Sequence, residues 1–345
     1  MAIDFGFLGI GGTLAQMRRR LGVGLVIALL SGAVTNLHSE IRVGMIGLDT
    51  SHVVAFTRLL NDASRDDHVP GARVTHAFKG GSPDVESSYT RVDGFTKTLA
   101  EDFGVEIVDS IEDLVAEVDA IMVESVDGRP HLAQATPGIV AGLPTFIDKP
   151  FSGSLGDAIA IAALAEKHET PVFSSSSYRF YPSLQELKET DVGEIKAAIS
   201  YGPAHLEPHH PDLYWYAVHP TEALYTILGA GCEWVTRVAQ PDVDVVTGVW
   251  ADGRVGTLYG LRTGATPHQV TVFGDAGVAR QEGGGNYRPL VVEIVRFFET
   301  GVPPVALRET VEMFAFMEAA DESKRRGGAP VRLDEVLAAH APATP

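Results

Sequence analysis

From Ile41 onward, short apolar runs alternate with segments of helical periodicity, and this order narrows the possible folds more than any other feature of the chain. Ile41–Leu48 is an apolar run with two glycines, interrupted only by Arg42, and it is typical of a strand buried on both faces of a parallel sheet. The alternation predicts parallel strands joined by right-handed helical crossovers. The strands expected here are Ile41–Leu48, Ala72–Phe78, Val105–Val108, Ala120–Val123, Thr145–Ile147 and Val172–Ser175, with helices near 53–60, 111–118, 132–141 and 155–168.

Beyond Pro182 the pattern becomes rich in strands. Asp252-Gly253 predicts a hairpin turn between two of them. Two helices close this half, at about 290–298 and 309–324. We therefore expect an α+β domain with a mostly antiparallel, open-faced sheet. Its predicted strands are Ile195–Tyr201, Val235–Ala239, Val243–Trp250, Val255–Leu261 and Val270–Phe273.

The length of 345 residues exceeds the usual size of one domain, about 100 to 150 residues. We expect a parallel-sheet domain at 40–150, extended by 151–177, and a domain at 178–333 that forms the substrate wall and supports oligomerisation. Residues 1–39 are an N-terminal extension and 334–345 a C-terminal tail in this scheme.

The first 39 residues have the order of a signal peptide. Arg18-Arg19-Arg20 precedes the apolar run Leu21–Val34, and Ser31-Gly32-Ala33 offers a small-residue cleavage site. The run of 14 residues is short for a membrane span, which needs about 20. We expect export to a periplasmic or extracytoplasmic location without stable membrane insertion, the alternative being a leader on a cytoplasmic enzyme.

Charge and cysteine content exclude several classes of partner and site. The formal net charge of -18 repels nucleic-acid phosphates, so no nucleic-acid partner is expected. Cys232 is the only cysteine, which excludes an intrachain disulfide and a cysteine-based metal cluster. Exposed faces of the strand-rich domain favour a homo-oligomer.

The turn Gly47–His52 is the first candidate binding motif. A dinucleotide fingerprint requires glycine at its first, third and sixth positions, and only Gly47 matches. Asp49 would direct a carboxylate toward a diphosphate, whereas Thr50, Ser51 and the helix N-terminus offer donors to it. A strand–helix turn capped by Asp49 or Ser51, with no nucleotide, is the open alternative.

Asp148-Lys149-Pro150 follows the predicted strand Thr145–Ile147, at the sheet edge where ligands of open parallel sheets bind. A partly desolvated lysine beside a carboxylate can exchange a proton with a substrate hydroxyl. A surface Asp–Lys pair is the alternative, and the position in the sheet favours function.

The chain resembles the glucose-fructose oxidoreductase / inositol dehydrogenase / MocA family (Gfo/Idh/MocA) over residues 41–333. Its most specific element is Asp148-Lys149-Pro150, which is Glu-Lys-Pro in most members. The segments with the family's order and spacing are Ile41–His52, Val118–His131, Gly142–Pro150, Tyr178-Arg179-Phe180 and Val218–Gly229.

The resemblance implies a Rossmann-type doubly wound parallel sheet, NAD or NADP as cofactor, and a sugar, cyclitol or related polyol as substrate. Lys149 falls on the family's catalytic lysine and His219 on its active-site histidine, with Asp148 orienting the lysine. The predicted cofactor-binding residues are Gly47, Asp49, Thr50, Ser51, His52, Lys79, Ser125, His131, Asp148 and Lys149. The predicted substrate residues are Tyr178, Arg179, His209, His210, Trp215, His219 and Glu222.

The chain also departs from the family pattern. Asp49 and His52 replace the second and third fingerprint glycines, and Glu124 stands where a small residue is usual. Lys79 follows the second strand, where an acidic residue usually binds the ribose, and it favours a 2′-phosphate. Trp215 replaces an aspartate four residues before His219. The choice between NAD and NADP stays open.

A third candidate is a stretch dense in imidazoles and carboxylates. Such groups can bind a divalent ion, but four prolines make most of the stretch a loop without fixed ligand spacing. The same residue types, with the rings of Tyr214, Trp215 and Tyr216, suit a sugar, so we favour a substrate wall and expect no metal. The residues are His205, Glu207, His209, His210, Asp212, His219 and Glu222.

The sequence thus favours hydride transfer between a nicotinamide and a polyol carbon, with Lys149 and His219 as the acid–base pair. Redox-neutral glycoside cleavage or epimerisation, a non-catalytic nucleotide- or sugar-binding protein, and a metal-dependent hydrolase or lyase are the alternatives.

Overall fold

The computed structural model describes residues 40–341. The predicted signal segment, 1–39, and the last four residues lie outside the described part. In the described part, no helix combines the length and the apolar character that a membrane crossing requires.

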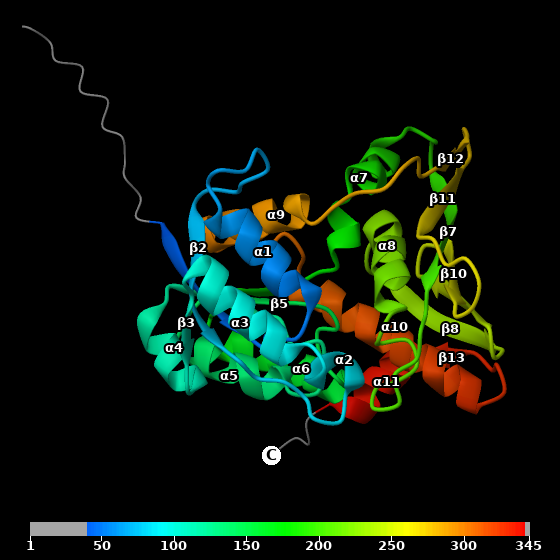
Figure 1. Ribbon diagram of the computed structural model, residues 1–345. Coiled ribbons are helices and arrows are strands. Elements are labelled where there is room, and N and C mark those ends of the chain that lie inside the picture. Colours follow the sequence, from blue (N-terminus) through cyan, green and yellow to red (C-terminus); the bar gives the residue numbers. More distant parts are fainter. Residues whose placement is uncertain (1–39, 342–345) are drawn as a thin grey trace, which may run out of the picture. The chain divides into compact units, whose positions relative to one another are not determined.

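The first half forms the predicted sheet, in which every paired strand is parallel (Figure 1). Its strand order is β3-β2-β1-β4-β5-β6, the doubly wound order of a Rossmann fold. The carboxyl ends of β1 and β4, where the order reverses, therefore form the expected ligand crevice. The strands are β1 Ile41–Ile46, β2 Ala72–Phe78, β3 Glu106–Val108, β4 Ala120–Val123, β5 Thr145–Ile147 and β6 Val172–Ser174.

Helices cover both faces of this sheet. Gly44 in β1 permits close packing of α4, because a Cβ there would overlap the side chain of Leu114. The short α2 and the helix α3 that follows it were not predicted from the sequence. The helices are α1 Ser51–Asn61, α2 Glu86–Tyr89, α3 Val92–Phe103, α4 Ile111–Glu117, α5 His131–Val140 and α6 Leu155–Lys167.

The second sheet has seven strands in the order β12-β11-β7-β10-β9-β8-β13. Only the β7–β10 pair is parallel. Buried residues alternate along β9 and β10, so one face packs against helices and the other stays open. The strands are β7 Ile195–Pro203, β8 Cys232–Ala239, β9 Val243–Trp250, β10 Val255–Leu261, β11 Gln269–Gly274, β12 Val278–Arg280 and β13 Val331–Arg332.

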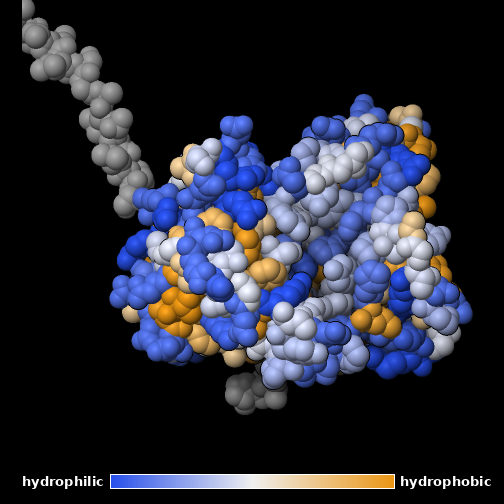
Figure 2. Space-filling model, viewed as in Figure 1, coloured by the Kyte–Doolittle hydropathy of each residue, from blue (hydrophilic) through white to orange (hydrophobic). Residues whose placement is uncertain are grey.

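The open face carries exposed apolar side chains, among them Val238, Tyr259 and Val278. Figure 2 shows apolar side chains gathered over β11 and β12. The remaining elements are the 3-10 turn η1 Ser177–Phe180 and the helices α7 Pro182–Glu189, α8 Val218–Leu228, α9 Arg288–Thr300, α10 Leu307–Arg325 and α11 Leu333–His340.

Two sequence predictions need correction here. The expected tail from 334 contains α11, because Leu333 and Val336 bury their side chains in the core of the protein. The helix α9, which we placed in the strand-rich domain, instead packs against the first sheet beside α1. Its Phe297 ring lies 4.8 Å from the ring of Phe173 in β6.

The packing of α9 generates a stability prediction. Phe297 is fully buried among aromatic rings, so Phe297→Ala should lower the free energy of unfolding by about 3–5 kcal/mol in urea denaturation. Val302→Ala is the matched control, because that side chain is 63% exposed. A loss below about 1 kcal/mol in Phe297→Ala would contradict the packing described.

Candidate cofactor and substrate cavity

A cavity of about 290 Å³ opens at the carboxyl ends of the first sheet. Lys149, directly after β5, and His219, in α8, both line it. The structure thus brings together two residues that lie 70 positions apart in the sequence and that we predicted as an acid–base pair. The other lining residues are Thr50, Ser51, His52, Ser87, Arg91, Val126, Ser177, Tyr178, Tyr181, Trp215, Tyr216, His268 and Tyr287.

The N-terminus of α1 contributes hydrogen-bond donors to the cavity. Thr50 is its N-cap residue, and no side chain caps the first turn. The Thr50 hydroxyl is buried, and no described residue forms a hydrogen bond with it. Unpartnered amides at a helix N-terminus attract anions, so this end of the cavity suits a phosphate.

Gly47 meets the first requirement of a dinucleotide fingerprint. It has a φ of +84°, and a Cβ there would overlap the side chain and backbone of Ser125. Only glycine therefore fits this turn without a shift of Ser125, in the loop that follows β4.

Asp49 does not face the cavity, contrary to our expectation that its carboxylate would oppose a diphosphate. The side chain is fully buried, and it accepts hydrogen bonds from the Val126 amide at 2.8 Å and the Ser88 hydroxyl at 2.6 Å. Burial raises the pKa of this carboxyl above its ordinary value. The second glycine of the fingerprint is thus replaced by a residue that points into the protein.

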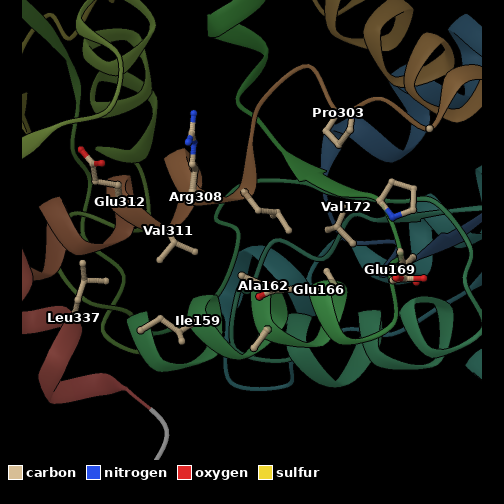
Figure 3. Close-up of a pocket in the computed structure, with 16 residues that line it drawn as sticks. Ile159, Ala162, Glu166, Glu169, Val172, Pro303, Arg308, Val311, Glu312 and Leu337 are labelled. Carbon is tan, nitrogen blue, oxygen red and sulfur yellow. The ribbon is translucent and has the colours of Figure 1, made fainter.

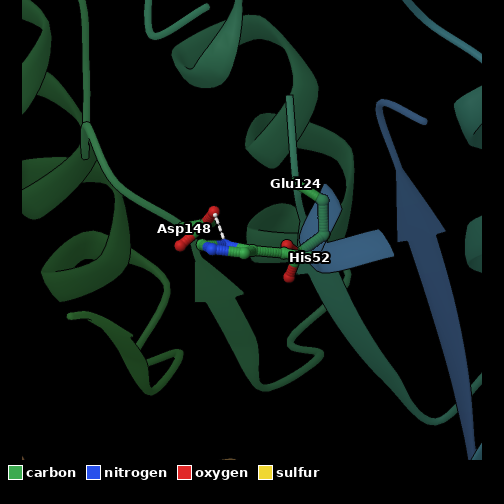
Figure 4. Close-up of side chains that lie close together, drawn as sticks. All are labelled: His52, Glu124 and Asp148. Atoms are coloured by element: carbon green, nitrogen blue, oxygen red, sulfur yellow. Dashed lines mark hydrogen bonds and ion pairs between the residues drawn. The ribbon is translucent and has the colours of Figure 1, made fainter. Parts of the chain in front are cut away.

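His52 and Asp148 form a buried pair beneath the cavity (Figure 4). His52 Nδ1 lies 2.6 Å from Asp148 Oδ2, and the imidazole lies against Phe56 and Tyr287. Asp148 was predicted to orient Lys149, but its side-chain hydrogen bond goes to His52. The pair with His52 lowers the pKa of Asp148 despite full burial.

Glu124 lies beside this pair and is also fully buried (Figure 4). Neither of its carboxyl oxygens has a hydrogen-bond partner among the described residues. Burial, and then the neighbouring Asp148 carboxylate, raise its pKa well above the ordinary value. Glu124 is therefore the neutral member of the three.

His219 is neutral at pH 7. Burial, followed by the nearby Lys149 ammonium, holds the pKa of His219 well below its usual range. Its Nδ1 lies 2.6 Å from the Ser176 hydroxyl, which leaves Nε2 for a ligand. The Lys149 ammonium lies 5.9 Å from the Tyr216 ring centroid.

His268 was not predicted from the sequence. It lies 5.6 Å from the His219 ring, and burial lowers its pKa to about 4. Tyr181 and Tyr287 also line the cavity and were not predicted. Tyr181 directly follows the family segment Tyr178-Arg179-Phe180, whereas Tyr287 is brought to the cavity from the N-terminus of α9.

Arg179 and Glu222, predicted to contact substrate, are buried against each other instead. The Arg179 Nε donates to Glu222 at 2.7 Å, and its Nη2 donates to Glu309 at 2.7 Å. Glu222 also accepts from the Ser176 amide at 2.6 Å. This network positions the segment that carries Ser176, the partner of His219.

His209 and His210 also lie outside the cavity lining. His210 Nε2 is 3.1 Å from Asp127, and Glu207 pairs with both histidines. These carboxylate partners fix the orientation of both imidazoles.

Three predicted cofactor residues make other contacts. Lys79 forms a surface ion pair with Asp93 at 2.6 Å. The Ser125 hydroxyl donates to Gln134 at 2.9 Å. His131 is fully buried between backbone carbonyls, and burial lowers its pKa. Of the cofactor set, the cavity is lined by Thr50, Ser51, His52 and Lys149.

A larger hollow of about 840 Å³ lies elsewhere, between α6, α10 and α11 (Figure 3). Its lining is mostly apolar, including Ile159, Val311 and Leu337. It also includes Pro171 and Val172, at the amino end of β6. Ligands of open α/β sheets bind at the opposite edge, so this hollow is not the candidate site.

The sheet order and the crevice at β1 and β4 define a two-domain protein of the Rossmann class. Residues 41–176 match the family described as "Oxidoreductase family, NAD-binding Rossmann fold". This match covers the parallel-sheet half of the chain, and it supports the resemblance to the Gfo/Idh/MocA family that the sequence predicted.

The protein YceM of Salmonella typhimurium, named as an oxidoreductase, is 31% identical over 90 residues. These residues are 26% of this chain and 29% of YceM, so the match spans under a third of that relative.

Solved structures share the fold over most of the chain. Scyllo-inositol dehydrogenase from Lactobacillus casei, solved with NAD(H) and scyllo-inositol, superposes with a TM-score of 0.71 at 14% identity, covering 86% of this chain and 99% of that one. Myo-inositol 2-dehydrogenase from Lactobacillus plantarum gives 0.70 at 17% identity, covering 85% and 99%. An oxidoreductase from Agrobacterium radiobacter, solved with NAD+, L-tartaric acid and magnesium, gives 0.70 at 16%, covering 87% and 100%.

The residues present fit the nicotinamide end of the family's cofactor. Gly47 keeps its tight turn, Thr50 and the α1 amides offer free donors, and Asp49 points away from the cavity. A cavity of 290 Å³ is at the small end of ligand sites, of which about 300–1,000 Å³ is typical.

The environment of Glu124 generates a pH prediction. The pKa of Glu124 is higher in the folded protein than its unfolded value of 4.5, so the folded state binds more protons above pH 4.5. This carboxyl therefore costs stability progressively as pH rises from 4.5 toward its folded pKa. Glu124→Gln removes this cost. The variant should therefore become more stable relative to the native chain, measured as the difference in free energy of unfolding, as the pH rises from 5 to 8. A pH-independent difference in urea denaturation would show that Glu124 stays ionised.

Proposed function

We propose that the protein is an NAD(P)-linked oxidoreductase that acts on a CH–OH group of a sugar, cyclitol or related polyol. The observation that carries this proposal is the shared cavity of Lys149, His219 and the α1 N-terminus. The inositol dehydrogenases of the same fold support the substrate class. The side chains around the cavity are hydroxyls, imidazoles and aromatic rings, which suit polyol faces and hydroxyl groups.

A nicotinamide cofactor bound in this cavity would supply the hydride chemistry, and Lys149 and His219 would then bind the substrate hydroxyl and take up or return its proton. His219 is neutral, so its Nε2 can accept that proton, while Ser176 fixes the ring through Nδ1. The Lys149 ammonium donates hydrogen bonds to the developing alkoxide. The lining of the cavity holds the polyol against both groups and excludes bulk water.

The open face of the second sheet supports association with a second copy of the chain, because its exposed apolar residues are Val238, Tyr259 and Val278. The sequence order of residues 18–34 supports export as part of the same proposal.

The test of the proposal is Lys149→Ala. Loss of one hydrogen-bond donor to a developing oxyanion lowers the rate by about 10²–10³-fold, so NADH formation with a panel of inositols, hexoses and sugar acids should fall by at least about 100-fold. NADH binding, followed by fluorescence titration, should be retained, because the cofactor contacts at α1 are untouched. Lys188→Ala, on the exposed side of α7, is the control and should turn over normally. Unchanged turnover in Lys149→Ala refutes the assignment.

A further inference from the structure

Two buried polar atoms at the cavity have no hydrogen-bond partner among residues 40–341. They are the hydroxyl oxygens of Thr50 and Ser87, and both residues line the cavity. Thr50 is only 4% exposed. Buried hydroxyls are normally hydrogen-bonded, so this pair, beside an uncapped helix N-terminus, points to a ligand with several acceptor oxygens.

The same end of the cavity is electropositive. None of the described residues that line the cavity is acidic, although the chain carries a net charge of -18. Arg91 lines it together with Lys149, and neither side chain forms an ion pair with a carboxylate within residues 40–341. Asp49, the buried acid that precedes Thr50 in the chain, is turned toward Ser88 and Val126.

Arg91 is held with its terminal nitrogens free. Its Nε donates to the backbone carbonyl of Ser87, and its guanidinium lies 6.0 Å from the Phe95 ring centroid. Neither Nη group has a hydrogen-bond partner in the described residues. A guanidinium fixed in this way presents two parallel donors, the geometry that binds phosphate.

The segment that carries Ser87 and Arg91 is fastened to the fingerprint turn. Ser88 donates to Asp49 at 2.6 Å, and Ser82 donates to Asp127 at 2.6 Å. Arg129 links Asp127 to Asp84 in the same segment. Asp49, at the position of the second fingerprint glycine, therefore anchors a new source of donors beside α1.

We propose that Arg91, Ser87 and Thr50 bind the phosphate attached to the nicotinamide riboside, and that this clamp replaces the contact usually given by the second fingerprint glycine. The inference rests on the proposed function, since it assigns new residues to the same cofactor. The phosphate concerned is the one next to the nicotinamide, because Lys149 and His219 line the same cavity.

The test compares two probes that differ by one phosphate, reduced nicotinamide mononucleotide and reduced nicotinamide riboside, by calorimetric titration of the full chain. Arg91→Gln should raise the Kd for the mononucleotide and for NADH by about 10- to 100-fold, and leave the Kd for the riboside unchanged. Arg91→Lys should give an intermediate loss, because it keeps the charge without the planar fork. Ser87→Ala should cost about 2- to 10-fold for the phosphate probes.

Arg308→Gln is the matched control, since it removes the same charge at the other hollow. It should bind all probes normally. If Arg91→Gln weakens the binding of riboside and mononucleotide equally, the clamp is overturned. The clamp is also overturned if the variant binds NADH with unchanged affinity but binds glucuronate, an anionic sugar, more weakly, because Arg91 would then bind substrate. A native chain that binds neither NADH nor NADPH would instead refute the proposed function, and Ser87→Ala keeps the clamp testable if Arg91→Gln fails to fold.

Discussion

The site depends on how the fold neutralises three carboxyl groups buried at one edge of the parallel sheet. Burial of a carboxylate is costly unless a partner or a proton compensates it. Asp49 is compensated by an amide and a hydroxyl, Asp148 by His52, and Glu124 by a raised pKa. None of the three carboxyl groups lines the cavity, so the lining contains Lys149 and Arg91 but no acidic residue among those described, although the chain as a whole is strongly acidic.

These contacts explain why residues other than glycine occupy two positions of the dinucleotide fingerprint. His52 stands at the third glycine position and supplies the partner of Asp148. Asp49 stands at the second and holds the segment with Ser88. Both substituted residues therefore form hydrogen bonds to other residues at the same edge of the sheet. Although glycine is absent at these two positions, no side chain caps the N-terminus of α1, and its amides stay available to a ligand.

Much of the fold could be predicted from the sequence, and the reasons differ by element. Most strands of the first sheet are short, mainly apolar runs, so their number and their positions along the chain could be predicted. In contrast, α3 contains Gly94 and buries only Val92 and Leu99, which leaves little periodic signal. β13 has two residues, too few for any alternation.

The site residues that could be predicted are those that lie in a sequence motif. Lys149 and His219 were found through the family resemblance, and they share the cavity. Arg179 and Glu222 were assigned to substrate, but a buried pair between residues 43 positions apart depends on tertiary packing that local pattern does not encode. Arg91 and His268 stand outside any motif, and only the folded chain brings them to the crevice.

The return of α9 to the first sheet has a consequence for biosynthesis. Phe173 and its neighbours emerge from the ribosome long before Phe297, the ring that covers them. A nascent chain that ends before residue 288 therefore displays an aromatic surface on an otherwise finished sheet. Truncated fragments that stop between the two sheets should need chaperones or aggregate, and they also lack Tyr287, the last residue in the chain that lines the crevice.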